Sequence, residues 1–217
     1  MILTRSSIDV GGRRARVLEW EGKRVRVYDD AVLALRVGEL LADDQIDAYY
    51  KRDLMEAMLV VDVEAAKAAF EDFDGFLAMA AWEVAGVDMD GTHAEESDGA
   101  QIIDWEEDAG HIQATLWQVY GRSFEEIGSR VSLRQLGELI GACPHETPMG
   151  QALYYRTAKE PKRTKHNEEE IKHFRERKAF WAIEGTAQGS EKAAKSKNDQ
   201  MTDMAMAFRR MAKKAEA

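Results

Sequence analysis

The stretch Asp104–Gly121, DWEEDAGHIQATLWQVYG, places four acidic residues ahead of a histidine, and such side chains could hold a metal ion or transfer protons. Glu107 and His111 are four residues apart, so they would share one face of a helix. A helical metal site needs further ligands, and this stretch contains neither an H-E-x-x-H nor an E-x-x-H pair. The spacing therefore favours the start of a helix over a metal or acid–base site.

The same acids fit an exposed helix cap. Asp104 is a suitable N-cap residue, acids in the first turn complement the helix dipole, and Gly121 stands where a helix end favours a left-handed residue. Apolar residues recur three and four apart and predict one buried stripe: Trp105, Ala109, Ile112, Leu116 and Val119. We expect Ile112, Leu116 and Val119 in the core, and the acids Glu106, Glu107 and Asp108 in the exposed cap.

A second candidate for chemistry is the pair Cys143 and His145, which flank Pro144 in a predicted loop. Nothing nearby in the sequence is expected to lower the pKa of the thiol, so a structural role is favoured over a nucleophile. One cysteine excludes an internal disulfide and a Cys-x-x-Cys site. We therefore expect no catalytic residues, no metal and no cofactor, and a protein that is not an enzyme.

Composition predicts a globular chain with an uneven distribution of charge. The 217 residues are 45% apolar, no run of 18 apolar residues is present, and the start does not look like a signal peptide, so we expect an intracellular protein. From Arg156 onwards there are 16 Lys and Arg against 10 Asp and Glu, whereas the preceding part has 14 against 30. Nucleic-acid binding is not expected of the acidic part and would have to reside in the basic tail.

The predicted fold is mainly α, a multi-helix globular domain with a small N-terminal β-hairpin and a C-terminal helical extension. Residues 1–30 contain alternating apolar runs around Glu21-Gly22, which predict the hairpin, packed on a helical body over 31–184. Within that body, SFEE at 123–126 is a capping box, Ser132 precedes a helical face, and Thr147-Pro148 starts another helix.

Residues 185–217 are predicted to be a linker followed by a basic, methionine-rich helix. The segment after Ile183 is small and polar, and one face of the helix would carry Met201, Met204, Phe208 and Met211. This stripe could dock on the body or grip a partner, and the sequence leaves both open. A partner could also be bound on the body around Tyr154, Tyr155 and Arg156.

The order of motifs resembles the tailed-phage family named after gene product fifteen. The resemblance covers about four fifths of the chain and is carried by IDVGG, RVRVYDDAVLALRVGELLADDQI, FEDFDGFLAMAAWEVAG, IIDWEEDAGHIQATLWQVYG, VSLRQLGELIGACPHETPMGQALYYRT and EEEIKHFRERKAFWAI. The spacing D-x-x-x-D, followed by YG and then by ETP and YYRT, is its most specific part. Leu133 and Leu136 stand where the family has aromatic residues, and VLEWEGKR is additional.

This resemblance implies a mostly helical tail assembly chaperone in the host cell cytoplasm. Its implied partner is the phage tape-measure protein, with the tail tube protein as a further candidate, and self-association stays open. Neither a membrane nor a nucleic acid is an expected partner. A structural head–tail or tail component is the second hypothesis. A small hydrolase or a nucleic-acid-binding regulator is the third, which would need a polar pocket or a basic groove.

Overall fold

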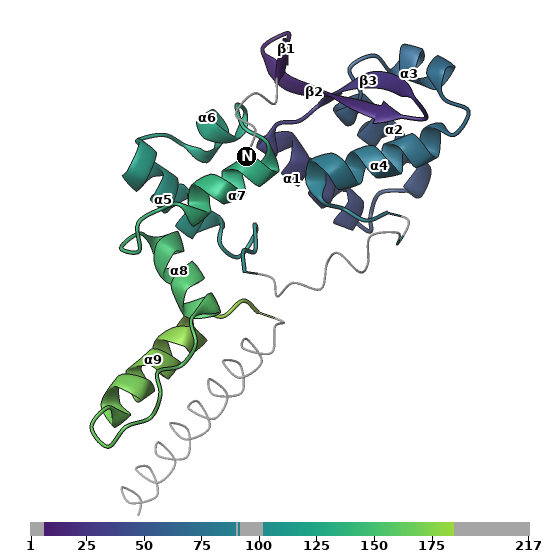
Figure 1. The fold of residues 1–217 in the computed structure, drawn as a ribbon. Helices are drawn as coiled ribbons and strands as arrows, with labels where there is room; N and C mark the ends of the chain where they lie inside the picture. Colours follow the sequence, from purple (N-terminus) through teal and green to yellow (C-terminus); the bar gives the residue numbers. More distant parts are fainter. Residues whose placement is uncertain (1–6, 90, 92–101, 185–217) are drawn as a thin grey trace, which may run out of the picture. The chain divides into compact units, whose positions relative to one another are not determined.

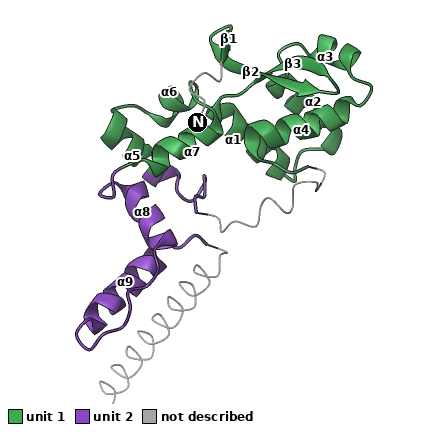
Figure 2. Cartoon of the chain, in the orientation of Figure 1, with its two compact units in different colours: residues 1–100, 112–143 green, residues 101–111, 144–217 purple. Residues whose placement is uncertain are grey.

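The computed structural model describes residues 7–89, 91 and 102–184, and it is mostly helical with a small antiparallel sheet (Figure 1). The chain divides into two compact units (Figure 2). Unit 1 contains residues 1–100 and 112–143, and unit 2 contains residues 101–111 and 144–217. The helical body expected over 31–184 is thus shared between two units. The predicted tail with Met201, Met204, Phe208 and Met211 lies outside the described residues.

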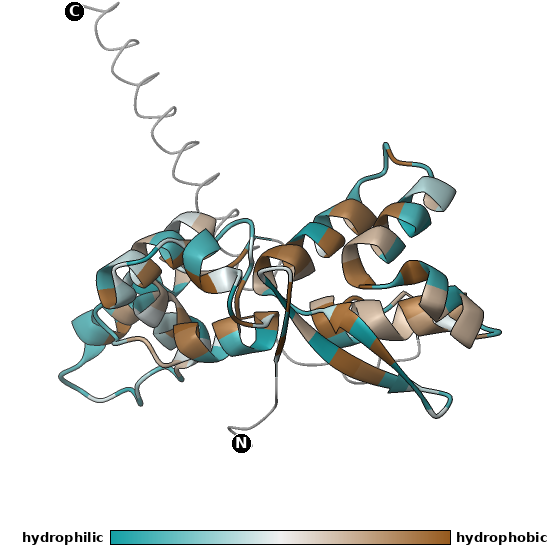
Figure 3. Cartoon of the chain, turned by 90° about the horizontal axis from the view of Figure 1, so that it is seen from above, coloured by the Kyte–Doolittle hydropathy of each residue, from teal (hydrophilic) through white to brown (hydrophobic). Residues whose placement is uncertain are grey.

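The sheet of unit 1 has three strands in the order β1-β2-β3: β1 (Ile8–Val10), β2 (Arg13–Trp20) and β3 (Lys23–Tyr28). Glu21 and Gly22 both have positive φ, 50° and 74°, the geometry of a two-residue hairpin turn whose twist matches the strands. Figure 3 shows apolar and polar residues alternating along the two long strands. The predicted hairpin is confirmed, and β1 extends it by a third strand.

Four helices follow the sheet, and each begins at an aspartate. They are α1 (Ala31–Ala42), α2 (Ala48–Leu59), α3 (Val63–Ala69) and α4 (Phe73–Ala85). The side chains of Asp30, Asp47, Asp62 and Asp72 accept hydrogen bonds from first-turn amides that have no partner within the helix. These four aspartates therefore contribute to helix initiation.

The core of unit 1 lies between these helices and the sheet. Helix α1 packs against α2, α4 and α7 (Leu133–Gly141), and β3 reaches α2 through a bridge between Val27 and Val60. Phe76 is fully buried and stacks on Phe70 with a ring-centroid distance of 4.8 Å. The aromatic stack and the aliphatic faces of α1 and α4 together form one apolar cluster.

Side-chain capping also organises the second half of unit 1. Helix α5 (Ala109–Tyr120) starts among the residues of unit 2 and continues in unit 1, where α6 (Phe124–Gly128) and α7 follow it. Ser123 with Glu126, and Ser132 with Gln135, form reciprocal capping boxes at α6 and α7. The predicted starts of both helices are confirmed.

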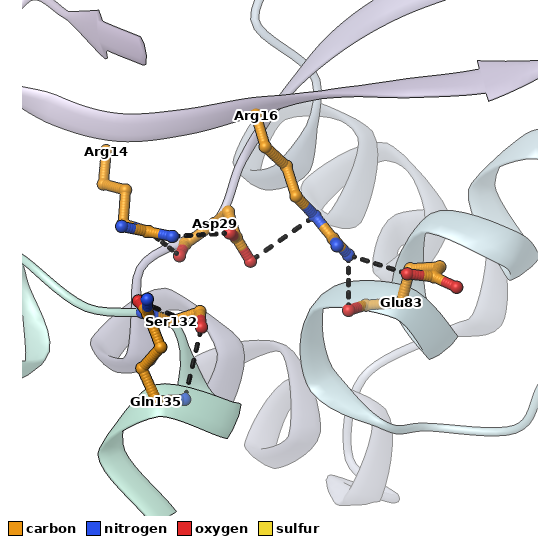
Figure 4. A network of polar contacts seen from close by, with 6 residues as sticks. All are labelled: Arg14, Arg16, Asp29, Glu83, Ser132 and Gln135. Atoms are coloured by element: carbon orange, nitrogen blue, oxygen red, sulfur yellow. Dashed lines mark hydrogen bonds and ion pairs between the residues drawn. The ribbon is translucent and has the colours of Figure 1, made fainter. Parts of the chain in front are cut away.

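A polar network joins β2 to α4 and to the loop before α1 (Figure 4). Arg14 Nε donates to the carbonyl of Asp29 at 3.1 Å, Arg16 Nε lies 3.6 Å from Asp29 Oδ1, and Arg16 Nη2 lies 3.1 Å from Glu83 Oε2. Burial raises the pKa of Asp29, and the nearby positive charges of Arg16 and Arg14 oppose that rise. Paired arginines thus make a nearly buried carboxylate tolerable at the seam between sheet and helices.

Unit 2 contains α8 (Pro148–Thr157) and α9 (Glu168–Phe180), which pack on each other. Thr147 caps α8 and Pro148 occupies its first turn, as predicted. Helix α9 ends at Phe180, whereas the corresponding sequence motif runs on to Ile183. None of the helices in the described ranges has both the length and the apolar character needed to cross a membrane.

The buried aromatic stack gives a direct test of the core of unit 1. Phe76→Ala should lower the free energy of unfolding by about 3–5 kcal/mol, because it removes a large apolar side chain and leaves a cavity. The control is Tyr49→Ala, which removes an exposed ring and should change stability by no more than about 0.5 kcal/mol. Urea unfolding followed by circular dichroism measures both, and equal effects would contradict the packing described.

Candidate functional site

The acidic stretch that opens α5 forms a turn ahead of the helix. Asp104 Oδ1 accepts hydrogen bonds from the amides of Glu106 and Glu107 at 3.0 and 2.8 Å, and the Asp104 amide donates to Asp108 Oδ2 at 3.0 Å. This turn precedes the helix, and the regular helix α5 begins at Ala109. Asp104 therefore caps a turn and not the first residues of α5.

The predicted burial of this segment is right in part. Ile112 and Leu116 are buried and Glu106 and Glu107 are exposed, as expected. The remaining members of the predicted stripe differ from the expectation: Trp105 and Val119 are half-buried and Ala109 is exposed. Asp108, expected in the exposed cap, has only 1% of its side chain exposed. The expectation was wrong for Asp108 because a distant cation, which helical periodicity does not reveal, binds this carboxylate.

That cation is Arg156 of α8. Its Nη1 and Nη2 atoms donate to Asp108 Oδ2 and Oδ1 at 2.6 and 2.8 Å, a bidentate geometry. Its remaining donors reach two main-chain carbonyls, Trp181 at 2.6 Å from Nε and Ile102 at 2.9 Å from Nη1. One side chain thus ties the 102–108 segment, α8 and the residues after α9 together within unit 2.

The surrounding contacts strengthen the same junction. Glu107 Oε2 accepts a hydrogen bond from the Glu184 amide at 2.8 Å, and the His111 ring packs edge-on against Trp181 at a centroid distance of 5.0 Å. Glu107 and His111, which the sequence placed on one face of a helix, each contact the segment after α9. Both side chains therefore contribute to the packing of this junction.

The three residues predicted around α8 to bind a partner have different environments. Arg156 has 6% of its side chain exposed and uses its guanidinium within unit 2, so that group is not presented to a partner. Tyr155 is half-buried against Phe174, with ring centroids 5.8 Å apart. Tyr154 is 45% exposed and meets the ring of exposed His145 at 4.6 Å. Of the three, Tyr154 offers the surface for recognition.

The start of α8 contains a close backbone approach that only glycine permits. The carbonyl of Pro144 accepts hydrogen bonds from the Thr147 amide and hydroxyl at 3.0 and 2.7 Å. A Cβ atom at Gly150 would fall well inside van der Waals contact of that carbonyl oxygen. The ETPMG sequence thus encodes a cap, a helix-starting proline and a space for the preceding chain.

The thiol of Cys143, the candidate nucleophile, is engaged in a contact within the fold. Cys143 Sγ donates to the carbonyl of Leu139 at 3.2 Å, and burial raises the pKa of this thiol above its ordinary value. A raised pKa keeps the sulfur protonated, which opposes nucleophilic chemistry. Across the described residues, no group of three or more His, Cys, Asp or Glu side chains is arranged to hold a metal ion.

A hollow of about 470 Å³ lies beside α9 in unit 2. Its lining consists of Arg163, Glu168, Ile171, Lys172, Arg175 and Glu176. Arg163 pairs with Glu168 at 2.8 Å and Arg175 with Glu160 at 2.7 Å, so much of the charge around it is internally balanced. Five of the six lining residues are charged, whereas small-molecule pockets are lined mainly by hydrophobic and aromatic side chains.

Sequence reasoning missed the exposed aromatic residues of unit 1. Tyr49 and Tyr50 in the first turn of α2 are 82% and 59% exposed, and Trp117 on α5 is 60% exposed. The exposure of these rings could have been inferred from helical periodicity. Met55 and Leu59 mark the buried face of α2, and Ile112 and Leu116 mark that of α5, so residues off those faces are expected to be exposed. Exposed aromatic rings are suited to contacts with apolar or cationic groups.

Gly150 provides a test of the geometry at the start of α8. Gly150→Ala should destabilise the protein by about 1–3 kcal/mol, because the new methyl group meets the Pro144 carbonyl, which cannot move without disturbing the cap. Gly110→Ala is the control: it places the same methyl group in open space on a helix and should be neutral or stabilising by up to about 1 kcal/mol. Thermal unfolding of both variants decides, and a Gly150→Ala chain as stable as wild type would contradict the close approach.

Compared with protein-family models, with curated proteins and with solved structures, the chain matches none.

Proposed function

We propose that this protein is a tail assembly chaperone of a tailed phage, which binds the tape-measure protein in the host cytoplasm while the tail tube polymerises. The observation that supports the proposal is that residues of the sequence motifs have joint structural roles in unit 2. Asp104 and Asp108 supply the D-x-x-x-D spacing, Thr147 the ETP motif and Arg156 the YYRT motif. These residues form the turn, the helix cap and the buried ion pair of unit 2. A motif series with such joint structural roles is better support for a family resemblance than separate helix patterns.

The surface chemistry also supports recognition of a helical client. Trp117 in unit 1, and Tyr154 and Phe180 in unit 2, expose 60%, 45% and 59% of their surfaces. Aromatic side chains bury much apolar area with little loss of conformational freedom, which suits them to the apolar faces of a long helical protein. The net charge of -10 would keep a complex dispersed in solution. Binding of this kind needs no catalytic residue, and we propose a protein that is not an enzyme.

Co-expression with the tape-measure protein tests the proposal. The full chain should raise the soluble fraction of the client, because it covers apolar faces that otherwise aggregate. A chain lacking residues 186–217 should lose most of this effect. A matched variant with Met201, Met204, Phe208 and Met211 replaced by glutamine should lose it too, although its length and charge are unchanged.

The controls separate binding from chemistry. A Cys143→Ser/His145→Gln chain should solubilise the client as well as wild type does, because neither side chain belongs to a reactive arrangement. Client solubility that is equal with full-length and truncated chains would move the binding surface onto the helical body around Tyr154. No gain of solubility with the full chain would contradict the proposal.

The location of the protein in an infection separates a chaperone from a structural tail component. In cells producing the encoding phage, the protein should be abundant in the lysate and absent from purified particles. A fixed copy number in particles would instead favour the structural head–tail or tail component.

A further inference from the structure

The cations on the inner side of the sheet in unit 1, which faces the helices, have partners within the fold. Arg14 and Arg16 extend from β2 to Asp29, at 3.4 and 3.6 Å (Figure 4). Lys23 Nζ, at the start of β3, donates to the carbonyl of Ala69. These positive charges are therefore used in joining the sheet to the helices.

Two further cations of β3, Arg24 and Arg26, point the other way. They alternate along the strand with Val25 and Val27, which pack in the core, so the two arginines lie together on the outer face of the sheet. Both are exposed, and neither side chain forms an ion pair or a hydrogen bond with any residue that the structure describes. The guanidinium groups of Arg24 and Arg26 are thus available to a partner.

The neighbouring strand completes this surface. On β2, Val17 lies opposite Arg26 and Glu19 lies opposite Arg24. Val17 is half-buried, and Glu19 is exposed without an ion pair to a described residue. We call Val17, Glu19, Arg24 and Arg26 the outer sheet surface. Its two arginines and one glutamate give it a positive balance, although the whole chain has a net charge of -10.

The spacing of the two arginines indicates the form of a partner. Residues two apart on one face of a strand are separated by about 7 Å, and an extended segment with carboxylates two residues apart has the same repeat. A guanidinium binds a carboxylate through a planar fork of donors. The outer edge of β3 is partly in use, because the Arg26 carbonyl accepts a hydrogen bond from the Val61 amide at 3.1 Å. A partner segment would therefore lie across the face, with its acids over the arginines.

A nucleic acid fits this surface less well than an acidic protein segment. Binding of single strands relies on exposed aromatic rings on which bases stack. The ring of Tyr28, two residues from Arg26 along β3, is covered by the Arg13 guanidinium, with 3.8 Å between Cζ and the ring centroid. The net charge of -10 also opposes the approach of a polyanion.

We propose that the outer sheet surface binds an extended acidic protein segment whose carboxylates are two residues apart. Arg24 and Arg26 each pair with one carboxylate, and Val17 contacts the aliphatic part of the segment between them. Glu19 opposes binding and so limits affinity. This binding site does not depend on the proposed chaperone role.

Binding of synthetic peptides to the full-length protein tests the proposal. Two peptides of identical composition contain only glutamate and threonine, with glutamate at every second position of one and at every third position of the other. In an extended chain the first spacing places all carboxylates on one side, whereas the second alternates them between sides. Measured by fluorescence polarisation, the first peptide should bind several-fold more tightly, and its affinity should fall as salt is raised.

Substitutions on the sheet locate the site. Arg24→Gln and Arg26→Gln should each weaken binding of the first peptide by about two- to fivefold, the range that exposed ion pairs supply. Glu19→Gln should strengthen binding, because a like charge beside the carboxylates is removed. Arg36→Gln is the matched control: it removes an exposed cation of α1 in the same unit and should leave the affinity unchanged. Thermal unfolding should be the same for all four variants, because each site is exposed.

The possible results separate a specific site from general attraction. Amide shifts in nuclear magnetic resonance spectra should change at residues 17, 19, 24 and 26 when the first peptide is added. Equal affinity for the two peptides would overturn the proposal, as would an effect of Arg36→Gln equal to that of Arg24→Gln, or no detectable binding. A single-stranded oligothymidylate that bound more tightly through the same arginines would also overturn it and assign the surface to nucleic acid.

Discussion

The buried ion pair between Asp108 and Arg156 is the interaction on which the fold of unit 2 depends. A buried charge is costly unless it is paired and its remaining hydrogen-bonding groups are satisfied, and the guanidinium meets this condition with one carboxylate and two carbonyls. The carboxylate belongs to the turn before α5, the arginine to α8 and one carbonyl to Trp181, directly after α9. Segments far apart in sequence are held by one side chain, so loss of either charge would leave the other buried and unpaired.

Local chemistry made much of the fold predictable from the sequence. The hairpin turn lies at Glu21-Gly22, where both residues have positive φ. The starts of α6 and α8 are set by the caps Ser123 and Thr147. In each case the sequence signal lies within a few residues of the structure that it determines. The pairing of Asp108 with Arg156 was not predictable. The two residues are 48 apart, and a helix pattern reports which face is apolar but not which distant charge approaches it.

The environments of the candidate site residues were also predictable only in part. An exposed cap was a sound expectation for Glu106 and Glu107, while Arg156 appeared to be a surface cation because sequence alone could not show that it is enclosed. The exposed rings of Tyr49 and Tyr154 belong to the surfaces available for recognition. Both lie on helices that have side-chain caps and buried faces, so these exposed rings are held on anchored helices.

A double-mutant cycle on Asp108 and Arg156 tests most directly whether this pair holds unit 2 together. Asp108→Asn, Arg156→Gln and the double variant are unfolded in urea as full-length chains, and amide hydrogen exchange is followed at residues 102–108 and 181–183. Each single change should cost about 3–5 kcal/mol, with a coupling energy above about 1 kcal/mol and faster exchange in both segments. Additive effects within about 0.5 kcal/mol, together with unchanged exchange, would show that the pair does not organise unit 2.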